Sequence, residues 1–392
     1  MAEARARTDA IPVWGALAAT SCMFIGWNWD ICWHRCIGRD TLWTLPHIAI
    51  YIALFIAFCY NTWLILSHTF GRRRDWPSLK VMGFRGPGSS FITLWAILAQ
   101  FSSIVFDDWW HNVYGLDSQV FTPPHFVLGT GIGCFYIGQI ILVATYGNTI
   151  MKDRPMTIRW VYLLMWALAL GNSLVGADAL YGPLGIRAVV FLASASLIVC
   201  FCFASVFEYL QWRWAILAHA GLYMLVVITL MQIFQFFPAT PQFGPVFHRV
   251  TTFAPPPFPL WLVIPAAATT LVIFRPGSKP RLVRYLAVGM VFAVALTLAN
   301  WGSSAFLSSE WSHNRFFAGD YPAAAFYESY KPVSMSIVPR MGLPALVFLR
   351  GELSPAQSLL GGAGVVVMAG LMAALGLWSG RGMGRWLRVV KQ

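Results

Sequence analysis

Apolar runs of about 20 residues recur along almost the whole of this 392-residue chain, and each could cross a bilayer core roughly 30 Å thick. Hydrophobic residues make up 58% of the sequence. Charged residues make up only 11%, about half of the fraction that is typical of a soluble domain. The sequence therefore predicts an all-α fold, a polytopic integral membrane helical bundle with about ten transmembrane helices.

The expected spans leave one long hydrophilic segment, 302–358, which we expect to be an extracytoplasmic cap rather than a plain connector. The regions around it are a duplicated two-helix region (1–147), a further transmembrane bundle (148–301), and a last helix with a basic tail (359–392). The ten expected spans are 11–33, 46–68, 91–111, 124–147, 157–177, 187–207, 213–237, 257–274, 282–301 and 359–379.

Lysine and arginine concentrate in the segments that follow the even-numbered spans. These residues are Arg72, Arg73, Arg74, Lys80, Arg85, Lys152, Arg154, Arg159, Arg213, Arg275, Lys279, Arg281, Arg284, Arg381, Arg385, Arg388 and Lys391. The positive-inside rule then predicts a multi-pass protein of the cell inner membrane with both termini in the cytoplasm. The net charge of +12 reflects this topology, so we expect no nucleic-acid partner.

One polar pattern, D-x3-H-x3-G-x-D followed by T-x-P-H, occurs twice at the outward ends of spans. The first motif (30–47) contains Asp30, His34, Asp40 and His47, and the second motif (107–125) contains Asp107, His111, Asp117 and His125. The two histidines are 13 residues apart in the first motif and 14 in the second. The apolar residues between the motifs have diverged while the polar positions match. We therefore predict that spans 1–2 and 3–4 are parallel repeats with a functional site at each outer end.

The spacing within each motif favours a metal site. An aspartate and a histidine four residues apart share one face of a helix, and the second histidine opens the neighbouring helix at the same depth. Two imidazoles and one carboxylate with open coordination positions can hold a catalytic transition metal. The predicted ligands are Asp30, His34, His47, Asp107, His111 and His125.

Other polar residues are assigned supporting roles, with a purely structural hydrogen-bond network as the alternative for the whole motif. Asp40 and Asp117 would orient the ligands, and Asp108 is an alternative carboxylate beside Asp107. Glu310, His313 and His248 are expected on the outer side, where they could cover the site.

The pattern D-x3-H-x12-H resembles the metal motif in the C subunit of the copper membrane monooxygenases, which oxidise methane, ammonia or short alkanes. Asp30, His34 and His47 match that motif at identical spacing, and the second motif matches with one extra residue. The resemblance covers about 20 residues per motif, and it implies copper as the cofactor, with iron or zinc as alternatives. The chain departs from that family in carrying the motif twice, in its ten expected spans, and in lacking the family's partner subunits.

Integral-membrane di-iron hydroxylases are disfavoured, because they carry clustered histidine boxes on the cytoplasmic side. No HxxxH or HxxHH box occurs here, and six of the eight histidines are expected on the outer side.

Three functions follow from this sequence. The first is a copper-dependent monooxygenase that activates dioxygen and hydroxylates an apolar small molecule arriving from the lipid bilayer. The second is a transporter or metal-handling protein that uses the same sites. A transporter should have polar residues that continue to the cytoplasmic side, and spans 1–4 have few below the motifs apart from Gln100 and Gln139, which weighs against this function. The third is a membrane subunit, in a homo- or hetero-oligomer, in which the motifs only hold helices together.

Overall fold

The protein is described by a computed structural model, which contains ten helices and one two-stranded hairpin in its described residues. Nine of these ten helices are long and apolar enough to cross a membrane, so the predicted polytopic helical bundle is confirmed. The described residues are 2–38, 40–71, 78–114, 122–181, 187–234, 236–240, 242, 253, 261–272, 282–307 and 355–391.

The helices lie where the apolar runs predicted them, and their ends fall within a few residues of most expected bounds. They are α1 (Ala2–Cys36), α2 (Leu45–Thr69), α3 (Gly88–Tyr114), α4 (Pro123–Asn148), α5 (Pro155–Tyr181), α6 (Arg187–Leu210), α7 (Ala215–Phe234), α8 (Val263–Val272), α9 (Leu282–Leu307) and α12 (Pro355–Val389). Helix α8 has 10 residues, fewer than the roughly 20 that cross a bilayer. Most other residues of that expected span, 257–274, lie outside the described residues.

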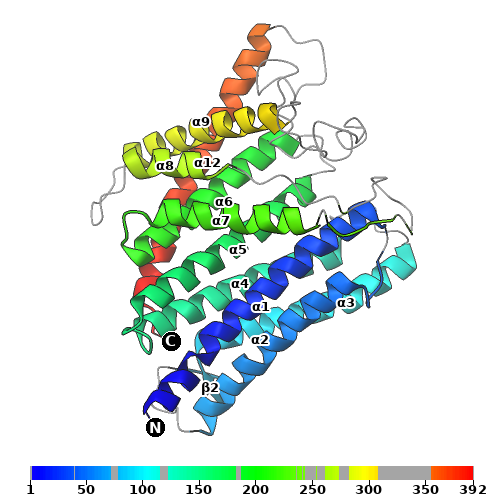
Figure 1. Ribbon diagram of the computed structural model, residues 1–392, viewed down its shortest axis with the longest axis vertical. Coiled ribbons are helices and arrows are strands. Elements are labelled where there is room, and N and C mark those ends of the chain that lie inside the picture. The colour runs from blue at the N-terminus through cyan, green and yellow to red at the C-terminus, as the bar shows by residue number, and fades with distance from the viewer. Residues whose placement is uncertain are drawn as a thin grey trace. The chain divides into compact units, whose positions relative to one another are not determined.

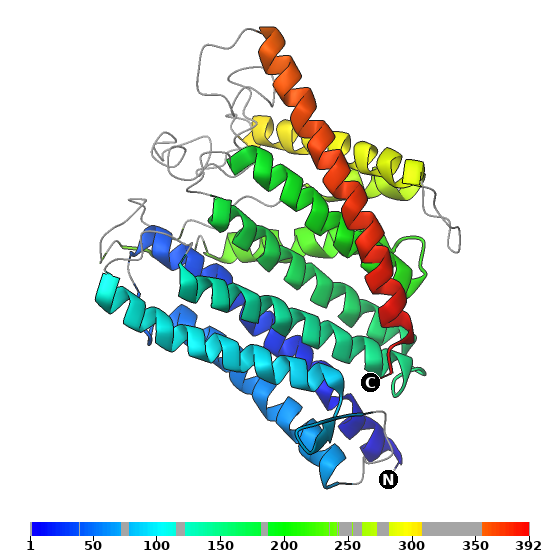
Figure 2. The ribbon, with the colours of Figure 1, turned by 180° about the vertical axis from the view of Figure 1, so that it is seen from behind.

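The chain forms two compact units. The first comprises Met1–Trp33, Arg39–Asn172 and Trp386–Gln392, and the second comprises His34–Gly38 and Ser173–Arg385. In the first unit α2 packs against α3, and α3 packs along α4 (Figure 1). The same neighbours lie side by side when the molecule is turned around (Figure 2). The described residues of both motifs belong to this unit, apart from His34–Gly38 at the end of α1.

Glycines let α3 and α4 approach each other closely. A Cβ added to Gly131 of α4 would lie 2.7 Å from Gln100 Cγ of α3, and one added to Gly138 would overlap Thr93 Oγ1. Small residues at such positions are typical of helix pairs in membranes, where close backbone approach replaces the hydrophobic effect between helices.

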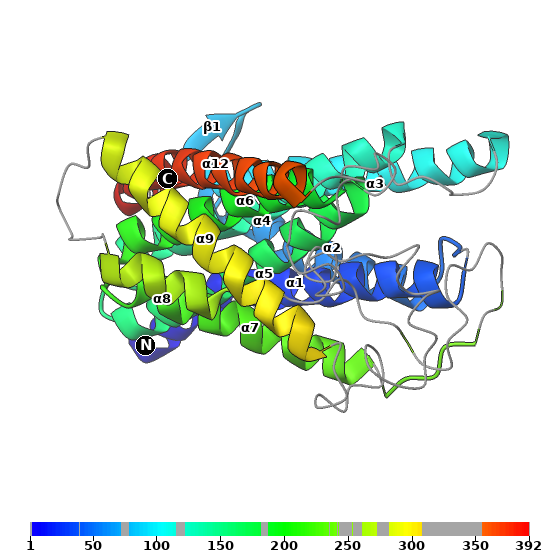
Figure 3. The same cartoon turned by 90° about the horizontal axis from the view of Figure 1, so that it is seen from above.

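In the second unit, α12 packs along α6 through glycines spaced four residues apart. A Cβ on Gly376 would lie 3.0 Å from the backbone nitrogen of Phe201, and one on Gly380 would lie 2.8 Å from the Phe201 carbonyl carbon. Gly384 meets Ser205 in the same register, so the two helices run parallel. Helix α9 runs obliquely to α12 (Figure 3), and Gly289 brings it close to α12.

A short antiparallel hairpin, which was not expected from the sequence pattern, follows α2. Strand β1 (Leu79–Val81) pairs with β2 (Phe84–Gly86) through a two-residue turn. Both turn residues have positive φ, 48° at Met82 and 89° at Gly83. Hairpin turns of this kind usually carry Asn-Gly or Asp-Gly. Methionine at the first turn position therefore gave no indication of a hairpin in the sequence.

A buried hydrogen-bond network links α1, α4 and α5 within the first unit. The Asn28 side-chain amide donates to Asn172 Oδ1 at 3.1 Å, and Asn172 Nδ2 donates to the Tyr136 hydroxyl oxygen at 2.7 Å.

Asn172→Leu should lower the free energy of unfolding by about 1–3 kcal/mol, because it removes a shared partner from two buried polar groups. Thermal unfolding of the purified protein in detergent measures this effect.

Thr20→Val is the matched control for that substitution. Thr20 is equally buried, but its hydroxyl donates only to the Ala16 carbonyl of its own helix, at 2.7 Å. We expect Thr20→Val to lower the free energy of unfolding much less than Asn172→Leu does. Equal losses from Asn172→Leu and Thr20→Val would show that the network between the helices adds nothing.

Candidate metal centre

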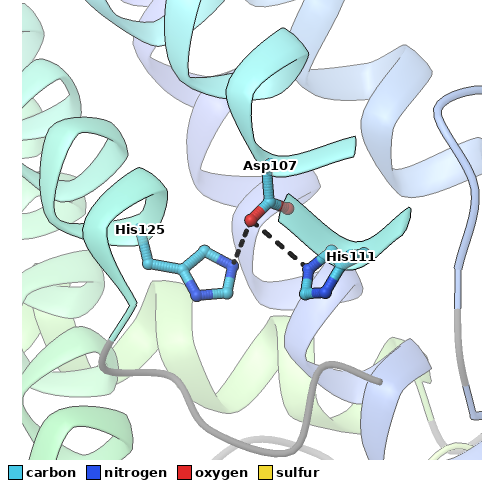
Figure 4. A group of neighbouring side chains, drawn as sticks. All are labelled: Asp107, His111 and His125. Carbon is cyan, nitrogen blue, oxygen red and sulfur yellow. Dashed lines mark ion pairs between the residues drawn. The ribbon is translucent and has the colours of Figure 1, made fainter. Parts of the chain in front are cut away.

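The second motif brings its three predicted ligands together. Asp107 and His111 lie one turn apart near the end of α3, and His125 is the third residue of α4. Asp107 Oδ1 lies 3.3 Å from His111 Nε2 and 3.6 Å from His125 Nε2 (Figure 4). One ligand atom from each residue lies within 4.8 Å of the other two. We call these three residues the Asp107 site.

Local contacts fix the first turn of α4 and the ring of His125. Thr122 precedes the helix with an extended backbone, and proline occupies the first turn, where a missing N–H costs nothing. Ser103 of α3 donates a hydrogen bond to the Pro124 carbonyl at 2.6 Å, which holds this turn against α3. Thr122 Oγ1 lies 3.0 Å from His125 Nδ1, so the ring presents Nε2 to Asp107.

The separations at the Asp107 site suit ligands that share a metal ion. Metal–ligand bonds of roughly 2.0–2.2 Å put two ligand atoms about 3.3–3.6 Å apart at the tetrahedral angle typical of zinc, and about 2.8–3.1 Å apart at the right angles typical of divalent copper. A charge-assisted hydrogen bond between an imidazolium and a carboxylate is shorter, about 2.7–2.9 Å. The observed 3.3 and 3.6 Å lie nearer to the first range. The three side chains are 11–26% exposed, which leaves the site shielded yet open to small molecules.

The first motif is arranged differently. The residues whose ligand atoms lie within 4.8 Å of one another are Asp30, His34 and Asp40. Asp40, expected to orient ligands, is therefore itself a candidate ligand. His47 contacts the same carboxylates, with Nε2 at 2.8 Å from Asp40 Oδ2 and 3.3 Å from Asp30 Oδ1. We call these four residues the Asp30 site.

The hydrogen bonds of His47 show which proton a metal ion would displace. Its Nδ1 lies 2.9 Å from the Thr41 carbonyl oxygen, which can only accept, so Nδ1 donates. Its Nε2 faces two carboxylates, so a proton or a metal ion has to lie between them. The 2.8 Å contact with Asp40 has the length of a charge-assisted hydrogen bond. A metal ion at this site would therefore replace a proton on His47.

The remaining predicted residues divide into one that the structure describes and four that it does not. Asp108 is exposed and does not join the ligand group of its neighbour Asp107; its carboxylate Oδ2 lies 3.4 Å from Asn112 Nδ2. The residues outside the described part are Asp117, His248, Glu310 and His313. Their assigned roles therefore stay predictions.

Aromatic side chains of α3 gather at the end of the helix that carries the Asp107 site. Phe106 stacks on Trp109 with ring centroids 5.9 Å apart, and Trp110 contacts Tyr114 at 4.4 Å. Trp110 and Tyr114 lie three residues after Asp107 and His111 respectively, so they share a helix face with these ligands. The arrangement can therefore hold a metal ion beside an apolar wall.

Comparison with known proteins gave no match: no protein-family model, no curated protein and no solved structure matches this chain. The candidate function therefore rests on the geometry of the two sites and on the spacing of the motifs.

Proposed function

We propose that this chain is a copper-binding membrane protein that activates dioxygen at the Asp107 site and hydroxylates an apolar substrate. The observation that carries the proposal is the convergence of Asp107, His111 and His125, with nitrogen-to-oxygen separations of 3.3 and 3.6 Å. Three such ligands leave coordination positions open for dioxygen, as in other sites with two histidines and one carboxylate.

Copper is favoured by the chemistry of the ligands and by the resemblance of the motifs to the C subunit of copper membrane monooxygenases. Divalent copper binds nitrogen and oxygen ligands more tightly than the other divalent first-row metals do. Iron and zinc accept the same ligands and are the alternatives. Copper when bound would supply the dioxygen chemistry. The residues of the chain would hold and orient it, and Trp110 and Tyr114 would line the approach of the substrate.

The basic segments after the even-numbered spans support an inner-membrane topology with both termini in the cytoplasm and both sites on the outer side. Helix α3 would then rise outward to Asp107, and α4 would return from His125. The ligands lie at helix ends, near the interface between lipid and water. An apolar substrate dissolved in the bilayer would reach the metal from the side.

Metal analysis of the purified protein tests the binding step. We expect wild-type protein to carry metal at both sites, and His34→Ala and His111→Ala each to lose the metal of its own site. His68→Gln is the matched control, because buried His68 lies at the other end of α2 and contacts the Leu64 carbonyl. Unchanged metal content in both alanine variants would refute the assignment of these ligands.

Dioxygen consumption by metal-loaded protein separates an enzyme from a metal carrier. With an electron donor and a short alkane, the wild type should consume dioxygen and His111→Ala should not. Bound metal without any dioxygen uptake would favour the metal-handling function, which uses the same side chains.

A further inference from the structure

The β1–β2 hairpin places two basic side chains directly opposite each other. Lys80 of β1 pairs with Arg85 of β2, and both residues are exposed. The Arg85 N–H donates to Thr69 Oγ1 at 2.8 Å, and the Arg85 carbonyl oxygen lies 3.1 Å from the same hydroxyl. Because both backbone groups of Arg85 face α2, the pair is of the kind without hydrogen bonds between its members, whose Cα atoms are only about 4.5 Å apart. We call Lys80 and Arg85 the hairpin basic pair.

Nothing in the described part of the chain neutralises the hairpin basic pair. Neither residue makes an ion pair with a described residue, and the segment 78–88 contains no aspartate or glutamate. Like charges that lie directly opposite each other destabilise a sheet. A hairpin of three residue pairs is only marginally stable by itself. An anion between the two side chains would replace their repulsion by attraction.

The length of α2 places the hairpin at the depth of lipid headgroups. Helix α2 has 25 residues, which corresponds to about 37 Å at 1.5 Å per residue. This length exceeds the roughly 30 Å of the hydrocarbon core but not the roughly 40–45 Å that include the headgroups. The hairpin is bonded to Thr69, the last residue of α2, and lies beside this end of the helix (Figure 1).

The hairpin basic pair points away from α2. A Cβ added to Gly86 would lie 2.7 Å from Ile65 Cγ1, so this face of β2 packs against α2. Successive side chains of a strand point to opposite faces of the sheet. The side chains of Arg85 and of its partner Lys80 therefore leave the hairpin on the face that α2 does not cover.

Exposed apolar side chains near the pair favour a lipid over a soluble anion. Met82 in the turn is 87% exposed, and Phe70, which is 71% exposed, contacts Phe84 with ring centroids 6.5 Å apart. Apolar side chains beside basic ones are typical of segments at the boundary between headgroups and acyl chains. A soluble phosphate would leave these apolar side chains in water.

We propose that the hairpin basic pair binds the phosphate group of an anionic phospholipid in the surrounding bilayer. The Arg85 guanidinium matches the geometry of phosphate oxygens, and the Lys80 ammonium would donate to the same group. The acyl chains would lie near Phe70 and Met82, along the end of α2. This inference is independent of the proposed metal chemistry, because the hairpin lies at the end of α2 opposite to His47.

Hydrogen exchange of the segment 78–88, measured by mass spectrometry on the full-length protein in nanodiscs, tests this proposal. A ligand that binds only the folded hairpin reduces the population of its open form. Attraction to an anionic membrane surface is worth about fivefold for each basic side chain, so wild-type exchange should be roughly fivefold or more slower in phosphatidylglycerol than in phosphatidylcholine. Lys80→Gln with Arg85→Gln should exchange equally in the two lipids.

Lys152→Gln with Arg154→Gln is the matched control. It removes the same charge from another exposed connection between two helices, where Arg154 Nε already lies 3.9 Å from Asp153 Oδ2. This variant should keep the wild-type difference between the two lipids. Lys80→Glu places a carboxylate opposite Arg85 and should slow exchange in both lipids alike, which shows that the hairpin still folds when the lipid is no longer needed.

Three outcomes would overturn the proposal. The first is equal exchange of the wild-type hairpin in the two lipids. The second is an unchanged lipid difference after Lys80→Gln with Arg85→Gln, which would assign the effect to another surface. The third is equal protection by inorganic phosphate added to phosphatidylcholine nanodiscs, which would make the hairpin basic pair a site for soluble phosphate.

Discussion

Asp107→Ala is expected to empty the Asp107 site of metal. Among the described residues, Asp107 is the carboxylate that contacts both His111 Nε2 and His125 Nε2, at 3.3 and 3.6 Å. Its loss leaves the two imidazoles without the carboxylate that would bind a divalent ion beside them and offset its charge. Loss of a residue that merely supports a ligand costs about 10–100-fold in metal affinity, and the loss of a ligand should exceed this. Titration of metal-free protein with copper measures the difference.

Asp108→Ala is the matched control, since it removes the same charge one residue along the helix. Asp108 lies outside the ligand group and contacts Asn112 instead. We expect this variant to keep copper affinity within a few-fold of the wild type. Equal weakening by the two substitutions would mean that general negative charge holds the metal. A larger loss of copper affinity in Asp108→Ala than in Asp107→Ala would identify Asp108 as the ligand in place of Asp107.

The transmembrane helices and the Asp107 site could be predicted because each depends on local spacing. An apolar run must be helical in lipid, where the backbone has to satisfy its own hydrogen bonds. Asp107 and His111 share a helix face by spacing alone, and the proline before His125 marks the start of the next helix.

The Asp30 site was harder to predict because it depends on the path of the chain between two helices. Asp40 and Thr41 follow α1 without regular structure, and their positions decide what His47 can contact. Thr41 lies outside the T-x-P-H pattern. The spacing of the motif residues therefore gave no sign that the backbone carbonyl of Thr41 would orient the ring of His47. A backbone acceptor leaves no trace in the side-chain pattern.

The helix interfaces were only partly visible in the sequence. Gln100 stood out as polar, whereas Ser89, Thr93 and Ser103 are common enough in membrane helices to escape notice singly. Their shared face becomes evident only when they are read at helical spacing from Asp107. The glycines of α12 carried a clearer signal, because G-x3-G spacing in an apolar helix is typical of close helix packing.

The largest expected loss of stability comes from Glu208→Ala. Glu208 of α6 and Arg381 of α12 are both only 4% exposed, and the carboxylate Oε1 lies 2.5 Å from Arg381 Nε. Removing one partner of a buried ion pair leaves an uncompensated charge and costs about 3–5 kcal/mol. The free energy of unfolding, measured by denaturant titration in mixed micelles, should fall by that amount.

Two further variants decide whether the buried pair causes this loss. Arg385→Ala removes the outer contact of Glu208, at 3.6 Å, from a side chain that is 48% exposed. A contact screened by water in this way contributes less than about 1 kcal/mol. Glu208→Met with Arg381→Met removes both buried charges and should recover most of the stability, because an apolar pair of similar size often replaces a buried ion pair without loss. If the double variant is as unstable as Glu208→Ala, the loss of stability comes from altered packing between α6 and α12. The unpaired buried charge of Arg381 is then not its cause.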